Sequence, residues 1–256
     1  MDLELAGKVA LISGGTSGIG LASAAAFLAE GACVALMARD TGRGEDAVRG
    51  LRAAHGAPED VVFCAGNVAQ KDDCARVVQE VQSYFGHIDV LVNAAGIYAE
   101  GALEALHEEE LDAVLATNVK GTMLLSQAAL PQIKEVRGNI VNVASDAGLH
   151  GNYFAAAYCA SKGAVVLFTR ALALEVASAG VRVNAIAPGD VMTPMTQAQL
   201  DAAPDPVQAL REMAGVYPLG RIATADEAAA LIVYLASARA AFMTGTICPL
   251  DGGLTA

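Results

Sequence analysis

Short hydrophobic runs alternate along the chain with longer segments that are amphipathic or rich in alanine. The short runs predict strands at residues 9–12, 33–37, 61–64, 90–92, 139–143 and 181–186. The longer segments predict helices at 21–30, 45–54, 72–85, 108–130, 153–179 and 224–236, and Pro131 should end the fourth of them. Apolar strands that alternate with helices indicate a parallel sheet buried on both faces, which is a doubly wound α/β fold.

The least regular part of the chain lies between Met192 and Pro218. It contains four prolines, at positions 194, 204, 206 and 218. Long irregular segments in compact domains are often lids or binding loops, so we expect a substrate-covering loop at about 192–218. No low-complexity linker or long repeat divides the sequence, and we therefore expect one catalytic domain over residues 1–256.

The composition argues against several classes of partner. Of the 256 residues, 54% are hydrophobic and 17% are charged, and a formal net charge of −12 disfavours a nucleic-acid partner or an anionic membrane surface. The longest uncharged run, 9–29, is too polar for a membrane span, and the start Met1-Asp-Leu-Glu4 lacks a secretory leader, so we expect a cytoplasmic protein. The five cysteines form no CxxC pair and no zinc-like spacing with histidine, so we expect free thiols and no metal site.

A glycine-rich turn follows the first predicted strand. It reads Ser13-Gly-Gly-Thr-Ser-Gly-Ile-Gly20 and leads directly into a predicted helix. Glycines let the backbone turn tightly and approach a phosphate, while the helix N-terminus offers free N–H groups and the positive end of its dipole. This strand–turn–helix context predicts a dinucleotide site.

Tyr158 and Lys162 lie four positions apart in the predicted helix over 153–179. Residues at this spacing share one helix face, so a phenol and an ammonium should be neighbours. Cys159, beside Tyr158, has no histidine at a base-like spacing and is expected to be a plain thiol.

Further segments complete a recognisable set. They are Asn93-Ala-Ala-Gly96, Asn118 within Thr-Asn-Val-Lys-Gly121, Ser145 thirteen positions before Tyr158, Tyr158-x-x-x-Lys162, Pro188-Gly-Asp-Val-Met-Thr193 and Asp251-Gly-Gly253. Together with the loop spacing Gly14…Gly18-x-Gly20, they resemble the short-chain dehydrogenase/reductase family over nearly the whole chain. The resemblance implies a Rossmann-type sheet and an NAD(P)-dependent enzyme that acts on CH–OH groups.

The resemblance also implies roles for individual residues. The catalytic residues that it implies are Ser145, Tyr158, Lys162 and Asn118. Lys162 would also hold the nicotinamide ribose, Ser145 would donate a hydrogen bond to the substrate oxygen, and Asn118 would interrupt its helix so that its carbonyl holds a water. The implied cofactor-binding residues are Gly14, Thr16, Ser17, Gly18, Ile19, Gly20, Arg39, Asn67, Val68, Asn93, Ala94, Gly96, Tyr158, Lys162, Pro188, Gly189, Val191 and Thr193.

The end of the second strand favours NADP(H). Members that use NAD carry an acid at the position of Ala38, whereas Arg39 can pair with a 2′-phosphate and Arg43 can assist it. Asp40, about twenty residues beyond the loop, and Ser17, where many NADP-dependent relatives carry a cation, keep NAD(H) possible. Asn67 replaces the family's usual Asp, and its side-chain carbonyl could still accept the adenine amino group.

The implied chemistry needs a proton transfer beside the hydride transfer, and Tyr158 is the candidate general acid and base. A free tyrosine has a pKa near ~10, so a shift of about three units needs roughly 4 kcal/mol of preferential stabilisation of the phenolate. We expect the close ammonium of Lys162, helped by the positive nicotinamide of the oxidised cofactor, to lower the Tyr158 pKa in this way.

The substrate is encoded less clearly than the chemistry. A hydroxysteroid, a 3-oxoacyl thioester, a sugar or a small cyclic alcohol all fit a mainly apolar pocket beside Asp146, Leu149, His150, Asn152 and Phe154. The alternatives are a non-catalytic NAD(P)-sensing protein, a sugar-type dehydrogenase or epimerase, and an enoyl reductase, whose members place more residues between Tyr and Lys. The resemblance further implies a homotetramer or homodimer that assembles through the helices beginning near 108 and 153.

Overall fold

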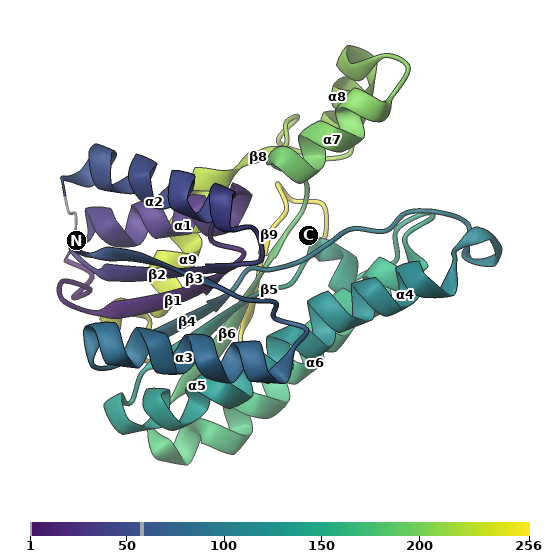
Figure 1. Ribbon diagram of the computed structural model, residues 1–256. Helices are drawn as coiled ribbons and strands as arrows, with labels where there is room; N and C mark the ends of the chain where they lie inside the picture. Colours follow the sequence, from purple (N-terminus) through teal and green to yellow (C-terminus); the bar gives the residue numbers. More distant parts are fainter. Residues whose placement is uncertain (1, 57–58) are drawn as a thin grey trace.

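The computed structural model, which describes residues 2–56 and 59–256, is a parallel sheet between two layers of helices (Figure 1). In this part of the chain seven strands form the sheet in the order β3-β2-β1-β4-β5-β6-β9. Their bounds are β1 Val9–Ser13, β2 Cys33–Ala38, β3 Val61–Ala65, β4 Val90–Asn93, β5 Asn139–Val143, β6 Arg182–Pro188 and β9 Ile247–Leu250. The predicted doubly wound α/β fold is confirmed.

Each strand sends alternate side chains to opposite faces of the sheet. In β1, Ala10 and Ile12 join one core cluster, and Val9 and Leu11 join the other. The first cluster includes α1 Gly18–Ala29, α2 Thr41–His55 and α9 Ala225–Ala236, and the second includes α3 Lys71–Phe85, α5 Thr122–Val136 and α6 Ala156–Val176. Burial on both faces explains why the strands read as continuous apolar runs.

Local sequence sets several helix ends. Thr224 and Glu227 form a capping box at the start of α9. The Asp40 side chain accepts a hydrogen bond from Arg43 N at the start of α2. Gly56 and Gly86 end α2 and α3 in the left-handed conformation.

The prediction that Pro131 ends its helix is wrong. Helix α4 Glu108–Val114 continues through a π-helical segment, η2 Leu115–Gly121, into α5, which contains Pro131 and ends at Val136. Proline removes one helical hydrogen bond, but Leu125, Ala129 and Ile133 remain buried against the sheet. This packing outweighs the local preference.

The predicted helix over 153–179 begins late. Helix α6 starts at Ala156, because Phe154 adopts a positive φ of 55° and Tyr153 and Phe154 are exposed in the preceding turn. Its last residues, Ala177–Ala179, form the 3₁₀ turn η4.

The prediction that residues 192–218 form an irregular loop is also wrong, because most of this segment is helical. The segment contains two helices, α7 Pro194–Ala202 and α8 Pro206–Gly215, which project beyond the end of the sheet (Figure 1). Each helix begins with proline, and Thr193 and Asp205 are the N-cap residues. Proline is favoured at this first helical position, so these prolines start helices here.

Two short strands, β7 Val191–Met192 and β8 Ala223–Thr224, pair beside these helices. The edge strand β9 was not among the predicted elements, and its Pro249 fits an edge position. The chain order reverses between β1 and β4, and ligands of open α/β sheets bind at the carboxyl ends of the strands near such a point.

Candidate active site

A cleft of about 560 Å³ opens at the carboxyl ends of β1, β4, β5 and β6. Most of the predicted site residues line it, namely Gly14, Ser17, Gly18, Ile19, Gly20, Ala94, Gly96, Ser145, Tyr158, Lys162, Pro188, Gly189, Val191 and Thr193. Six predicted residues do not line it: Thr16, Arg39, Asn67, Val68, Asn93 and Asn118. Segments far apart in the sequence therefore meet at one end of the sheet.

The glycine loop leaves its backbone open toward this cleft. Gly14 has a φ of 66°, and a Cβ there would lie 2.9 Å from the Ala94 carbonyl oxygen. A Cβ on Gly20 would collide with the Gly14 carbonyl group. Ser17, the N-cap of α1, makes no side-chain capping hydrogen bond. The first N–H groups of α1 can therefore receive an anion, and the residues fit the phosphates of a dinucleotide.

Lys162 lies buried beneath the cleft, one helical turn after Tyr158 on α6. Its Nζ donates a hydrogen bond of 2.9 Å to the carbonyl oxygen of Val143 at the end of β5. The same nitrogen lies 5.6 Å from the centroid of the Tyr158 ring. Desolvation by burial lowers the pKa of Lys162 from 10.5 to about 8.

Ser145 follows β5 directly and is buried beside the cleft. Its Oγ donates to Asp146 Oδ1 at 2.8 Å and accepts from Ala147 N at 3.2 Å. The resemblance implies that Ser145 donates to the substrate oxygen. In the structure the hydroxyl group lies within hydrogen-bond distance of two acceptors of the chain itself, Asp146 Oδ1 and, at 3.3 Å, the carbonyl oxygen of Pro188.

Asn118 joins three segments at the rear of the site. It is buried in η2, where the chain is π-helical, so the expected interruption of regular helix is present. Its Nδ2 donates to Ile97 O (2.9 Å) and Ser161 Oγ (3.0 Å), and its Oδ1 accepts from Ile97 N (2.9 Å). Its backbone carbonyl accepts from the Thr122 hydroxyl group at 2.8 Å.

Asn93 connects strands to helices behind the cleft. Its Nδ2 donates to Asn142 Oδ1 at 2.8 Å and to Ser126 Oγ at 3.0 Å. Asn142 in turn donates to Thr169 Oγ1 at 2.9 Å. All four side chains are buried, so β4, β5, α5 and α6 are tied together by polar contacts.

The residues predicted for the adenine end lie at the ends of β2 and β3. Arg39 is exposed, whereas Asp40 caps α2 and pairs with Arg43 Nε at 3.4 Å. Asn67 uses its side-chain Oδ1 within its own turn, accepting from Ala69 N at 3.0 Å. Val68 is buried against η2, since a Cβ on Gly121 would lie 2.7 Å from Val68 Cγ2.

Known proteins resemble this chain over its full length. A family model described as enoyl-(acyl carrier protein) reductase matches residues 14–255. The 3-oxoacyl-[acyl-carrier-protein] reductase FabG of Thermotoga maritima is 40% identical over 253 residues, which are 98% of this chain and 99% of that one. The L-fucose dehydrogenase of Bos taurus is 37% identical and covers 99% of this chain and 91% of its own. The crystal structure of L-sorbose reductase from Gluconobacter frateurii, complexed with NADPH and L-sorbose, has a TM-score of 0.94 at 32% identity, with both chains covered completely. The chain belongs to the short-chain dehydrogenase/reductase family.

As a short-chain dehydrogenase/reductase, the protein is an NAD(P)-dependent oxidoreductase that interconverts an alcohol and a ketone. The description of the family model names enoyl reduction. Three residues separate Tyr158 from Lys162, however, and this spacing resembles that of the carbonyl-reducing members.

In the protein chain by itself, the pKa of Tyr158 is raised, which is the opposite of the direction expected with the oxidised cofactor bound. Burial raises the pKa of Tyr158 to about 12, and a hydrogen bond with Ser145 opposes the rise only in part. The nearby carboxylates of Asp146 and Asp190 raise the Tyr158 pKa further. The buried amine of Lys162 is itself costly to charge.

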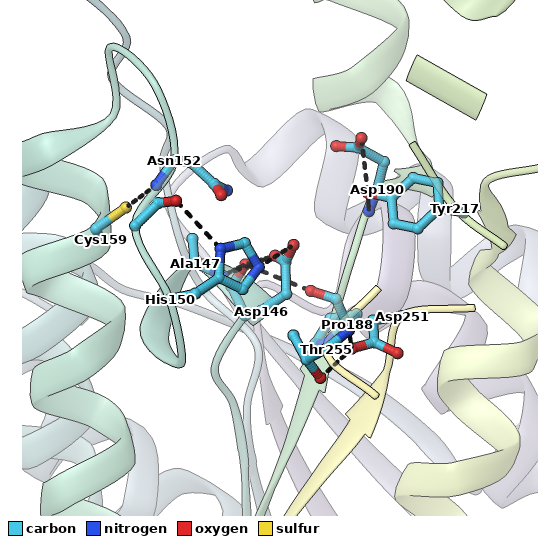
Figure 2. A network of polar contacts seen from close by, with 12 residues as sticks. Asp146, Ala147, His150, Asn152, Cys159, Pro188, Asp190, Tyr217, Asp251 and Thr255 are labelled. Carbon is cyan, nitrogen blue, oxygen red and sulfur yellow. Dashed lines mark hydrogen bonds and ion pairs between the residues drawn. The ribbon is translucent and has the colours of Figure 1, made fainter. Parts of the chain in front are cut away.

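Several residues of the cleft were missed in the sequence. Tyr98 packs edge-to-face on Tyr158, with 4.8 Å between ring centroids. Asp190 lies inside the Pro188–Thr193 segment, and its Oδ2 accepts from the Tyr217 hydroxyl at 2.8 Å (Figure 2). The position of Asp190 within the motif could have marked it, but nothing near Tyr217 in the sequence points to this contact.

Within residues 2–56 and 59–256, no three His, Cys, Asp or Glu side chains gather as a metal site would require. In the same part of the chain, no helix combines the length and the apolar character that crossing a membrane requires.

The buried amine of Lys162 gives a test by pH. The folded-state pKa of about 8 lies below the ordinary value of 10.5, so the unfolded chain binds more protons between these values. We expect the free energy of unfolding of the wild type, relative to Lys162→Met, to rise by up to about 3 kcal/mol as the pH passes through this window. Urea unfolding at pH values below and above the window measures this difference. The exposed Lys71→Met is the matched control, for which the stability difference from the wild type should not change over this window. A difference between the wild type and Lys162→Met that also stays constant with pH would contradict the burial of the amine.

Proposed function

We propose that Tyr158 transfers the proton to and from the substrate oxygen, with Ser145 beside it and Lys162 behind it. The single observation that carries this proposal is their convergence at one cleft: Tyr158 and Lys162 share a face of α6, and Ser145 stands at the end of β5. General acid–base catalysis of this kind contributes roughly 100- to 10,000-fold in rate.

The supporting residues hold this arrangement in place. Asn118 bonds Ser161, the neighbour of Lys162, and also fixes the backbone of Ile97 next to Tyr98. Lys162 is positioned for the ribose hydroxyl groups of a nicotinamide nucleotide, because a Cβ on Gly96 would lie 3.6 Å from its Nζ and glycine leaves that space open. When bound, the nicotinamide supplies or accepts the hydride.

The cofactor would lie across the switch point between β1 and β4. Its pyrophosphate would contact the loop of Gly14, Thr16, Ser17, Gly18, Ile19 and Gly20, and its nicotinamide end would meet Ala94, Gly96, Pro188, Gly189, Val191 and Thr193. Val68 and Asn67 would border the adenine, with Asn93 supporting the sheet beneath.

NADP(H) is the favoured cofactor. Asp40, the acid that could have bound the ribose, is engaged as the cap of α2 and with Arg43. Arg39 remains exposed at the end of β2, where its guanidinium can pair with a 2′-phosphate. The L-sorbose reductase structure contains NADPH.

The substrate should be small and polar. Asp146, His150, Asn152, Asp190 and Gln199 line the cleft, which favours polar groups over the apolar skeleton of a hydroxysteroid. The two carboxylates also disfavour an anionic substrate. Relatives named as acting on L-fucose and L-sorbose point to a sugar-like alcohol or ketone, and the FabG relative keeps a 3-oxoacyl thioester as the second candidate.

We further propose that residues 1–256 act as one catalytic domain that α7 and α8 cover. Met195, Thr196 and Gln199 of α7 line the cleft, as do Val216 and Tyr217 after α8. The covering segment predicted at 192–218 would therefore be this helix pair.

A homotetramer is the favoured assembly. Leu167 (65% exposed) and Leu174 (84% exposed) lie two turns apart on α6, and Leu115 and Met123 are exposed on η2 and α5. Leu115 and Met123 line a groove of about 1180 Å³, together with charged residues of both signs, Asp112, Glu175, Lys120 and Lys134. An apolar face with both signs of charge suits self-association about a two-fold axis. Phe242, fully exposed beside the edge strand β9, marks a second face.

The first test is turnover by wild type and Tyr158→Phe. Polyols, ketoses, a hydroxysteroid and a 3-oxoacyl thioester are assayed with both NADP(H) and NAD(H). The wild type should turn over a polyol or ketose best. Tyr158→Phe should lose roughly 100- to 10,000-fold in kcat while binding the cofactor almost normally, because only the proton transfer is removed. Tyr234→Phe on α9 is the matched control, and a variant Tyr158→Phe with normal kcat would refute the assigned role.

Arg39→Ala tests the cofactor choice. Loss of a charge-assisted contact to the 2′-phosphate should weaken the binding of NADPH roughly 10- to 100-fold, which corresponds to about 1.5–3 kcal/mol of binding free energy. The affinity for NADH, which lacks this phosphate, should hardly change. Fluorescence titration of both nucleotides measures the two dissociation constants. Arg43→Ala should show a smaller selective loss, and equal losses for both nucleotides would argue against NADP(H).

Leu174→Glu tests the assembly. A buried charge without a partner disfavours the interface, so this variant should sediment as a smaller species than the tetrameric wild type at micromolar concentration. Tyr84→Glu, an equally drastic change at an exposed aromatic residue of α3, should not. A monomeric wild type would rule out the proposed tetramer.

A further inference from the structure

Tyr158 stands in the first turn of its helix. It is the third residue of α6, which starts at Ala156, and the preceding turn exposes the side chains of Tyr153 and Phe154. Helix ends fray more readily than helix interiors. A side chain that must exchange a proton with a substrate at a fixed distance therefore needs support from another part of the chain.

Tyr98, in the loop after β4, makes such a contact. Its ring packs edge-to-face on the ring of Tyr158, with 4.8 Å between the centroids and 73° between the planes. Aromatic pairs attract each other in this arrangement, because the positive edge of one ring meets the negative face of the other. Lys162 Nζ lies 5.6 Å from the centroid of the same Tyr158 ring. Two groups from different segments therefore approach this ring.

The loop that carries Tyr98 is held on both sides of it. Asn118 binds both backbone groups of Ile97, with its Nδ2 donating to the carbonyl oxygen and its Oδ1 accepting from the N–H, each at 2.9 Å. Three residues after Tyr98, Gly101 N donates to Phe154 O at 2.7 Å. The loop is thereby tied to η2 and to the turn before α6, so its aromatic ring keeps its place.

Tyr98 itself is poorly suited to accept the proton. Burial raises the pKa of Tyr98 above the ordinary value of 10, and the nearby carboxylates of Glu100 and Asp190 raise it further. Its hydroxyl group therefore stays neutral over the pH range of an activity assay. Replacing Tyr98 by an uncharged residue removes a ring and leaves the charges of the cleft as they are.

The ring of Tyr98 also affects how well water reaches Tyr158. The polar groups around Tyr158 come from three segments of the chain: Ser145 and Asp146 after β5, Cys159 and Lys162 on α6, and Asp190 after β6. Burial has a larger effect than any of their charges, and together these effects raise the Tyr158 pKa to about 12. Removal of a ring that covers Tyr158 should admit water, which solvates the phenolate and screens the carboxylates, and both changes lower this pKa.

We propose that Tyr98 is a positioning residue for the reaction, which holds the ring of Tyr158 in one orientation beside Lys162 and keeps water from one side of that ring. This inference rests on the proposed function of Tyr158. Tyr98 acts through Tyr158 and not on the reacting atoms. An aromatic ring is sufficient for this task, so the hydroxyl group of Tyr98 is dispensable.

The test measures the rate of NADPH formation in a single turnover, so that product release does not hide the chemical step. Each variant receives NADP⁺ and the alcohol that the wild type oxidises fastest. Tyr98→Ala should be roughly 10- to 100-fold slower, because small displacements of a reacting group are costly in rate. Tyr98→Phe keeps the ring and should retain most of the wild-type rate.

Tyr84→Ala is the matched control. Tyr84 forms an edge-to-face pair of nearly the same geometry with Phe85, with 4.7 Å between the centroids and 74° between the planes. It is exposed on α3. Its replacement removes an equivalent aromatic pair away from Tyr158 and should leave the single-turnover rate unchanged.

The pH dependence of this rate separates positioning from a general loosening of the structure. Oxidation of the alcohol needs deprotonated Tyr158, so the rate rises with pH up to the pKa of Tyr158 in the complex. In Tyr98→Ala this rise should move to lower pH, whereas Tyr98→Phe and Tyr84→Ala should keep the wild-type profile. A loosened structure alone lowers the rate at every pH and leaves the profile in place.

Tyr98→Leu is the second variant for the case in which Tyr98→Ala does not fold. Leucine fills part of the space but offers no aromatic edge. The rate should fall and the pH profile should shift in the same directions as for Tyr98→Ala, by smaller amounts.

The other outcomes separate this inference from the proposed function. An unchanged rate without the ring of Tyr98, or a lower rate with the wild-type pH profile, would overturn the positioning role. Equal losses in Tyr98→Phe and Tyr98→Ala would overturn it as well, because the hydroxyl group would then be the active part. In each case an inactive Tyr158→Phe leaves the proposed function standing, and a normally active Tyr158→Phe overturns both.

Discussion

The reactive end of this protein depends on the burial of one amine. Lys162 lies beneath the cleft, and the contact of its Nζ with Val143 O fixes the side chain to the end of β5. Burial makes the charged form expensive, which lowers its pKa to about 8. The same buried surroundings raise the Tyr158 pKa to about 12. Both groups are therefore poised to respond strongly to any charge that enters the cleft, since interactions strengthen where water is excluded.

The parallel sheet makes this burial possible. Its strands carry apolar side chains on both faces, so their carboxyl ends are the places where polar groups can meet. Gly14 can approach the backbone of Ala94 and Ala95 there because it has no side chain, since a Cβ would lie 2.9 Å from their atoms. Behind the cleft, the chain of contacts from Ser126 through Asn93 and Asn142 to Thr169 holds two strands and two helices in register. Strands and helices that are tied together thus position the groups proposed to carry the chemistry.

The parts proposed to meet the substrate are of a different kind. Asp146 and His150 belong to the turn after β5, Asp190 belongs to the turn after β6, and α7 and α8 project beyond the end of the sheet (Figure 1). Changes in these segments leave the sheet core untouched. This division explains how relatives named for an acyl thioester, for fucose and for sorbose can share one framework with this chain.

The amino-acid sequence by itself determined the fold class and pointed to many of the residues that line the cleft. Buried parallel strands appear in the sequence as short apolar runs, which local analysis can recognise. The glycine loop is constrained by the close approach of backbone segments, and the Tyr158–Lys162 spacing is constrained by helix geometry. Local readings failed where packing prevails over propensity. The helix runs through Pro131 because its apolar face is buried, and the prolines at 194 and 206 begin helices because Thr193 and Asp205 precede them as caps. Only the tertiary structure decided the contact of Tyr217 with Asp190, the pairing of His150 with Asp146 and the direction of the Tyr158 pKa, because each depends on burial and on neighbours that no sequence spacing reveals.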